Sequence, residues 1–205
     1  MPLIRPILLS LVFPLLLGCG ALKTISDAGA SLDAFTLSPA TTTAAAASGT
    51  RHLVVEMPTS AGALSTDRIL VKPIPFQAQY LPDGRWSEPA PALVQTLLVA
   101  SFHNLGGFRL VGRNGAGLQP DLTLMTELQE FHSEPSVPGE APLTVRVSAM
   151  MTLIRESDRR IIGSRRFTAS AIVTTDTTIA LVSGFDSALQ TVLQAAVKWT
   201  QGQAG

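Results

Sequence analysis

Few side chains of this chain are of the types that commonly act as nucleophiles or bind metals. The 205 residues contain one cysteine, Cys19, and three histidines, His52, His103 and His132. A single thiol excludes an internal disulfide and any site that needs two thiolates. The histidines are isolated from one another and from carboxylates at the spacing of a metal site, so ordinary surface or hydrogen-bonded positions are expected. We therefore predict no catalytic residue, no metal site and no cofactor.

Motifs that bind phosphate or activate a serine are also missing from the sequence. It contains neither a G-x-S-x-G nucleophile elbow nor a phosphate loop that ends in Gly-Lys-Ser/Thr. Gly112, Gly115 and Gly117 follow a short predicted strand but lead into no predicted helix, so a solvent loop is favoured over a nucleotide site. Carboxylates such as Asp121 and Glu127 lack the spacing of an acid–base pair. An enzyme is therefore not expected.

The one thiol is placed where a lipid could be attached. The apolar run Ile7–Leu17 would reach roughly 17 Å as a helix, against about 30 Å for the hydrocarbon core of a bilayer. It is too short to span a membrane and fits the apolar region of a secretory signal. Its end, Leu16-Leu17-Gly18-Cys19, resembles the lipobox of bacterial lipoproteins, although Leu17 is bulkier than the small residues commonest at that position.

The lipobox resemblance implies that residues 1–18 are a cleaved lipoprotein signal peptide and that Cys19 carries acyl chains such as palmitate. Each buried methylene contributes roughly 0.8 kcal/mol, so two or three acyl chains anchor a protein stably. The alternatives are a plain secretory signal that happens to contain a cysteine, and a buried free cysteine. The lipid anchor is favoured because the only cysteine stands where a lipobox requires it.

Composition divides the rest of the chain into a tether and a domain. Residues 19–50 are rich in Ala, Ser, Thr and Gly, and the run 41–50 is low in complexity and lacks the periodicity of a core. We expect a lipidated linker or long surface loop here, in which 35–37 could add one short strand. Residues 51–205 are expected to form the folded domain.

Charge limits the partners that this domain can have. Lys and Arg number 15, as do Asp and Glu, so the formal net charge is zero. This balance excludes a basic nucleic-acid binder and a highly charged disordered chain. Four arginines surround a predicted hairpin, and a solvated face is favoured there over contact with headgroups or an acidic partner; they are Arg159, Arg160, Arg165 and Arg166. Trp86 is expected to pack on the first helix, with a partner or lipid surface as the alternative.

Apolar periodicity predicts a mixed β-sheet covered by at least two helices. The expected strands are 52–57, 68–72, 77–81, 108–111, the alternating stretch from Leu122, 144–154 and 161–173, and the expected helices are 90–105 and 178–201. A turn is expected at residues 82–84. The strand 68–72, the helix 90–105 and the strand 108–111 are expected to form a right-handed parallel crossover.

The last helix carries one apolar stripe, which is expected to pack on the sheet. The stripe consists of Val182, Phe185, Leu189, Val192, Ala196 and Trp199. The alternative for its far end, around Trp199, is contact with a partner or with a second copy of the chain.

Several short segments together resemble the auxiliary lipoproteins of ABC-type lipid transport systems, such as the paraquat-inducible lipoprotein. These segments are residues 66–71, 79–81, 85–86, 91–95, 121–124, the strand pair 144–173 and residues 197–200, within about 33–200. The resemblance implies a three-layer α/β domain similar to the N-terminal domain of TolB, and no catalysis. It also implies a mammalian-cell-entry (MCE) domain protein of the periplasm, an ABC permease and an ATPase as partners, with a lipid ligand and a homo-oligomer as further possibilities.

The leading hypothesis is an outer-membrane lipoprotein that acts as a non-catalytic component of lipid transport across the envelope. Gly20, rather than Asp, follows Cys19, which in enterobacterial-type sorting favours the periplasmic face of the outer membrane. The alternative is a structural or assembly lipoprotein that scaffolds an envelope complex without handling lipid.

Overall fold

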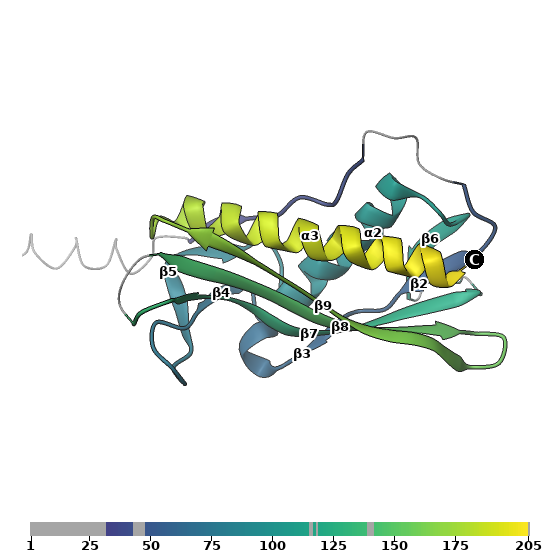
Figure 1. Cartoon of the computed structure of the whole chain (residues 1–205), viewed down its shortest axis with the longest axis horizontal. Helices are drawn as coiled ribbons and strands as arrows, with labels where there is room; N and C mark the ends of the chain where they lie inside the picture. Colours follow the sequence, from purple (N-terminus) through teal and green to yellow (C-terminus); the bar gives the residue numbers. More distant parts are fainter. Residues whose placement is uncertain (1–31, 43–47, 115–116, 118, 139–141, 205) are drawn as a thin grey trace, which may run out of the picture. The chain divides into compact units, whose positions relative to one another are not determined.

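The structure is a computed structural model that describes residues 32–42, 48–114, 117, 119–138 and 142–204. The predicted signal peptide, 1–18, and Cys19 lie outside the described residues. Within these residues the chain has a mixed α/β fold with a nine-stranded sheet and two α-helices (Figure 1), which confirms the predicted fold class. The strands are β1 (Asp33–Phe35), β2 (His52–Val55), β3 (Thr59–Ser60), β4 (Arg68–Val71), β5 (Gln79–Trp86), β6 (Leu110–Arg113), β7 (Leu122–Pro135), β8 (Leu143–Arg155) and β9 (Arg160–Val173). The helices are α2 (Ala90–Leu105) and α3 (Thr178–Ala204), with a 3-10 turn, η1 (Gly62–Leu64).

Strand β7 organises the sheet because it pairs with strands on both sides along its length. The strand order is β1-β5-β4-β7-β2-β6, and β8 and β9 extend from β7 as an antiparallel meander. The first part of β7 pairs parallel with β2, from Leu53 opposite Leu122, and its last part pairs parallel with β4, where Leu70 lies opposite His132. The predicted antiparallel strands 144–154 and 161–173 are thus confirmed as β8 and β9.

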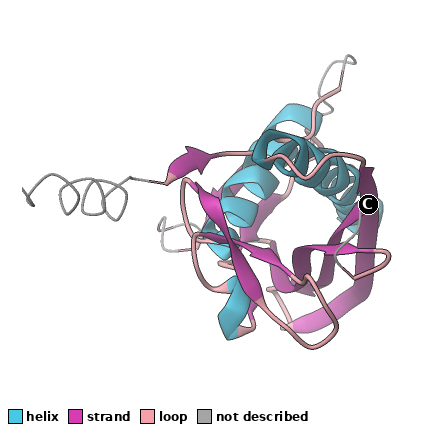
Figure 2. Ribbon diagram, turned by 90° about the vertical axis from the view of Figure 1, so that its left-hand side faces the viewer, coloured by secondary structure: helices cyan, strands magenta, loops and turns pink. Residues whose placement is uncertain are grey.

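The core lies between the sheet and the two helices. Helix α3 runs along β8 and β9 and also contacts α2, and the sheet curves around the helix pair (Figures 1 and 2). The alternate residues of β8 that face this layer are buried: Val145, Val147, Ala149, Met151 and Leu153. The buried face of α3 is wider than the predicted stripe, because the helix contacts both the sheet and α2. It adds Leu181, Ala188, Leu193 and Val197.

Helix α2 occupies the predicted range 90–105 because both of its ends carry local start and stop residues. Pro89 is the N-cap, and a second proline follows in the first turn, where its missing N–H is not needed. Gly106 and Gly107 have φ values of 74° and 92°, which favour glycine. A Cβ on Gly107 would lie 2.7 Å from Cγ of Gln201, and the Gln201 amide donates to the Gly106 carbonyl at 2.8 Å.

The turn predicted at residues 82–84 is wrong, because β5 continues through it. The pairing of β4 with β5 shifts register between Arg68 and Leu70, so the Pro and Gly signals mark an irregularity within the strand. Gly84 is also paired with Asp33 of β1. A Cβ at Gly84 would lie 2.9 Å from the Phe35 ring, so glycine permits this close pairing.

The strands 68–72 and 108–111 run parallel in one sheet, as predicted, but they are not neighbours, and β5 comes between β4 and α2 along the chain. Strand β6 pairs parallel with β2, and β7 and β2 separate it from β4 in the sheet. Helix α2 contacts both β2 and β6, and the buried Gln95 amide donates to the Val55 carbonyl at 3.0 Å. Short apolar strands give no local indication of which distant strand they will join.

The described part of the predicted tether, 19–50, packs on the domain. The folded unit begins at Asp33, and Leu37 and Ala40 are buried. Ala40 N–H donates to the Ser101 hydroxyl at 2.9 Å, and the Asn104 amide donates to the Ala40 carbonyl at 3.0 Å. Residues 33–42 therefore belong to the fold, which shortens the segment that could serve as a tether to 19–32.

Candidate functional site

The lipid-attachment residue predicted from the sequence, Cys19, lies outside the described residues, so the candidate site is sought on the domain itself. An elongated hollow of about 280 Å³, here called the end groove, opens where β4, β7 and β8 meet the start of α3. Figure 1 shows β4, β5 and the first turn of α3 at this same end of the molecule. The groove is lined mainly by apolar side chains with a few charges at its rim, including Val71, Leu81, Leu143, Leu181, Lys72 and Asp176.

A second hollow of about 370 Å³ adjoins the end groove and shares Lys72 and Glu134 with it. Its walls are the β4–β5 loop, residues 72–76, and the residues that follow β7 as far as Pro138. Three side chains around this hollow stand out into solvent and are called the apolar tip: Ile74, Phe76 and Val137. Ile74 and Val137 are about half exposed, at 48% and 53%, and Phe76 is fully exposed.

A buried histidine and two partly exposed charged side chains form a network beside the end groove. His132 is 2% exposed, and its Nε2 lies 3.3 Å from Oε2 of Glu134, whose other oxygen accepts a hydrogen bond from Nε of Arg146. Burial, and then the charge of Lys72, lower the pKa of His132. Burial acts to raise the pKa of Glu134, but the hydrogen bond and charge of Arg146 together lower it.

This network does not assemble a catalytic constellation. Arg146 neutralises the Glu134 carboxylate, and the lowered pKa of His132 keeps its ring uncharged near neutral pH. Among the described residues, His, Cys, Asp and Glu form no group of three that could hold a metal ion. The end groove therefore offers an apolar contact surface that is bordered by charged side chains.

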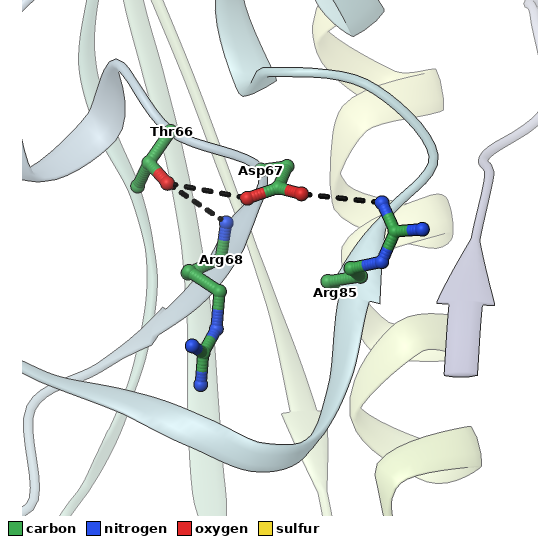
Figure 3. Close-up of polar contacts among 4 residues, drawn as sticks. All are labelled: Thr66, Asp67, Arg68 and Arg85. Atoms are coloured by element: carbon green, nitrogen blue, oxygen red, sulfur yellow. Dashed lines mark hydrogen bonds and ion pairs between the residues drawn. The ribbon is translucent and has the colours of Figure 1, made fainter. Parts of the chain in front are cut away.

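The segments 66–71 and 85–86, here together called the motif, have a structural role (Figure 3). Asp67 accepts a hydrogen bond from Arg85 at 3.2 Å, and its backbone carbonyl accepts one from Trp86 N–H at 2.6 Å. The Thr66 carbonyl accepts from Ala90 N–H at 3.0 Å, which fixes the first turn of α2 to the start of β4. The motif thus joins two strands and a helix.

The same motif places Trp86 in the centre of the core. Its side chain has an exposed fraction of 0%, and its ring lies 5.4 Å from that of Phe131 and 5.2 Å from that of Phe185. The alternative of a partner or lipid surface at Trp86 is therefore wrong. The aromatic rings that pack against it come from β7 and α3, and the buried residues of α2 belong to the same core cluster.

The arginine cluster lies at the other end of the sheet, around the β8–β9 hairpin (Figure 1). Arg159, Arg160, Arg165 and Arg166 are all exposed. Arg159 contacts Glu156 at 3.4 Å, and the Arg165 guanidinium lies 5.3 Å from the centre of the Phe167 ring. These contacts agree with a solvated hairpin face.

Two further candidates from the sequence have local partners. The half-buried ring of Trp199 packs edge-on against Phe167, with 5.6 Å between ring centres, so the end of the stripe contacts β9. The Nε2 atom of His103 lies 3.1 Å from the Val111 carbonyl oxygen and ties α2 to β6. Sequence reasoning missed the end groove, whose residues are distant in sequence. It also missed the contact of His132 with Glu134, which the two-residue spacing on one face of a strand could have indicated.

Comparison with known proteins identifies relatives of most of the folded unit. Residues 35–197 match the family described as the ABC-type transport auxiliary lipoprotein component. A protein from Bradyrhizobium diazoefficiens is 26% identical over 148 residues, which are 72% of this chain and 39% of that protein, so the chain spans less than half of the relative's length.

Solved structures share the fold. The crystal structure of protein XCC0632 from Xanthomonas campestris has a TM-score of 0.74 at 25% identity and covers 85% of this chain and 96% of that one. A second crystal structure has a TM-score of 0.64 at 16% identity and covers 83% and 99%. In the part of the chain that the structure describes, no helix is long and apolar enough to cross a membrane.

Proposed function

Since this chain belongs to the family of ABC-type transport auxiliary lipoprotein components, we propose that it is the non-catalytic, lipid-anchored component of a system that transports lipid across the cell envelope. The observation that carries the proposal is the family match, which extends over residues 35–197 and so includes almost all of the folded unit. The energy for transport would come from a separate ATPase. An ABC permease and an MCE-domain protein of the periplasm complete the proposed system.

The anchor of the proposed lipoprotein is Cys19, and its proposed location is the periplasmic face of the outer membrane. Residues 19–32 would connect the acylated cysteine to the folded unit, which begins at Asp33. Acyl chains can hold a domain at a membrane that none of its described helices crosses.

We expect Cys19→Ala to move the protein out of the membrane fraction, because the substitution removes the thiol that would take the lipid. The measurement is fractionation after a high-salt wash, with Ser157→Ala, in the exposed β8–β9 turn, as the matched control. A Cys19→Ala protein that stays in the washed membranes would contradict the lipid anchor, and wild-type protein found only in the inner membrane would contradict the outer-membrane location.

The end groove supports a docking role more than the enclosure of a whole lipid. Its volume of about 280 Å³ lies just below the range of about 300–1,000 Å³ that is typical of small-molecule sites. The second candidate is an assembly lipoprotein that scaffolds the envelope complex without handling lipid, and the exposed apolar side chains of Ile74, Phe76 and Val137 beside the groove suit such a contact.

Purification of the acylated protein with its envelope partners separates these two functions. Transport predicts that an MCE-domain protein, a permease and an ATPase co-purify with bound lipid above the amount found with a Cys19→Ala control. Scaffolding predicts the partners without that lipid. Steady hydrolysis of a lipid or nucleotide by the purified chain alone would contradict both candidates.

A further inference from the structure

We infer that the apolar tip formed by Ile74, Phe76 and Val137 inserts into the interface of the membrane to which the chain is anchored. The inference rests on the proposed lipid anchor at Cys19 and adds a second point of contact, made by the folded domain itself. The ligand of this site is the lipid surface, at the level where headgroups meet acyl chains.

The tip has the exposure and conformation of a contact surface rather than of a core. Phe76 is fully exposed, and Ile74 and Val137 are about half exposed, although all three are large apolar residues. Phe76 also has a φ value of 66°, which is uncommon for a bulky residue and persists where the surrounding structure imposes it. This conformation holds the ring outside the fold, and prolines at 73 and 75 stiffen the loop on either side of Ile74.

The direction of β1 relates the start of the folded unit to the tip. Strand β5 starts at Gln79, directly after the tip loop, and runs away from the tip to Trp86. Strand β1 is parallel to β5, with Asp33 opposite Gly84, so of the residues of β1 Asp33 is the one nearest to the tip. The start of α3 also lies at this end, because Asp176 and Leu181 line the end groove together with Lys72.

The chain between the anchor and the fold is short. Thirteen residues separate Cys19 from Asp33, and the fourteen steps between the two Cα atoms reach at most about 50 Å in any conformation. Gln79 and Arg85 lie opposite Val71 and Arg68, which are three residues apart on β4, so Gly84 is roughly 10 Å along the sheet from the start of β5. A tether of this length keeps the domain within about 50 Å of the membrane, where Ile74 and Phe76 can reach the lipid surface.

The charges around the tip favour apolar insertion over electrostatic adsorption. In residues 72–80 the only charged side chain is Lys72, at the base of the loop. The neighbouring Glu134 is paired with Arg146, and Asp176 lies at the rim of the end groove. The affinity of a protein for a membrane interface increases with the apolar area that it buries and with its attraction to anionic lipids. For the apolar tip, the buried apolar area contributes more than the charge. We expect little dependence on salt.

The test uses the full acylated chain in vesicles of phosphatidylethanolamine and phosphatidylglycerol. An environment-sensitive dye is attached to Gln77→Cys, which is next to Phe76 and exposed, or to Ser157→Cys in the β8–β9 turn at the opposite end. Quenching by brominated acyl chains reports depth. We expect quenching at position 77, none at 157, and no change in 0.5 M salt. Adding Phe76→Ser to the Gln77→Cys protein should lower the ratio of inserted to non-inserted tips about ten-fold or more.

The outcomes separate failure of the tip from failure of the anchor. A chain that lacks acyl chains by mass spectrometry and does not float with the vesicles would contradict the proposed anchor. An acylated, floating chain with equal quenching at positions 77 and 157 would overturn the insertion of the tip. A dye at position 77 that responds only when envelope proteins are added, and is not quenched by lipid, would assign the tip to a protein partner and likewise overturn the inference.

Discussion

Substitution of Trp86 should destabilise the domain far more than substitution of its neighbour Arg85, although both belong to the same short motif. Trp86 is completely buried between the rings of Phe131 and Phe185. Truncation of a buried tryptophan to alanine costs about 3–5 kcal/mol, and each aromatic contact contributes about 0.5–1.5 kcal/mol beyond the buried area. We therefore expect Trp86→Ala to lower the free energy of unfolding by about 4–5 kcal/mol, a large share of a typical 5–15 kcal/mol.

Arg85 provides the matched control. Its ion pair with Asp67 joins side chains that are 39% and 36% exposed, and solvent-screened pairs of this kind contribute about 0–1 kcal/mol. In a domain of this size, 1 kcal/mol shifts the melting temperature by about 2–4 °C, so Trp86→Ala should melt about 8–20 °C earlier and Arg85→Ala no more than about 4 °C earlier.

The assay is urea and thermal unfolding followed by far-ultraviolet circular dichroism, because loss of a tryptophan would alter a fluorescence signal. Trp86→Phe, which keeps an aromatic ring, should fall between Trp86→Ala and the wild type. Equal losses of stability for Trp86→Ala and Arg85→Ala would refute the argument that the motif acts through the core.

Two further predictions concern helix α3 and the buried histidine. Gly184→Ala should lower the free energy of unfolding by about 1–3 kcal/mol, because the new Cβ would lie 2.6 Å from Cγ2 of Val173. Gly202→Ala, whose new Cβ has nothing within 4 Å, should raise the free energy of unfolding by about 0.4–1 kcal/mol. Urea unfolding of the two variants checks both expectations. The lowered pKa of His132, caused by burial and by Lys72, means that the unfolded chain takes up a proton near pH 6.5 that the folded chain does not. Stability should therefore fall as the pH decreases from 7.5 to 5.5, and His132→Gln should flatten this dependence; a wild-type melting temperature that is constant over this range would contradict it.

The elements that local residues determine were predicted well. Helix α2 matches the expected range because Pro89 and Gly106 act within one turn of its ends. Strands β8 and β9 follow from the alternation of apolar residues, and their hairpin follows from a short polar segment between them. Propensity and periodicity are properties of neighbours in sequence, so a single chain is sufficient to show them.

Features that depend on distant partners were missed. Strand β5 continues past Pro82 because β1 and β4 pair with it, and nothing near Pro82 indicates either strand. The end groove brings together Lys72, Glu134 and Asp176, each of which looks in sequence like an ordinary surface charge. His132 appears isolated in the sequence, and only the folded sheet places it beside Arg146, which lies opposite it on β8. The lipid attachment at Cys19 stays a prediction.

The pairing of β1 with β5 has a mechanical consequence for a protein tethered at its N-terminus. Three residues of β1, Asp33 to Phe35, lie in parallel register with Gly84 to Trp86. A pull on the anchored segment along the strand loads these pairings in shear, so they resist together rather than opening one at a time. After β1, Ser38 N–H donates a hydrogen bond of 2.6 Å to the Asp186 carboxylate. This bond connects the chain to α3, the longer of the two described α-helices. Tension on a tether attached before β1 would thus be resisted at two places, the pairing with β5 and the hydrogen bond to α3, instead of peeling off the first strand.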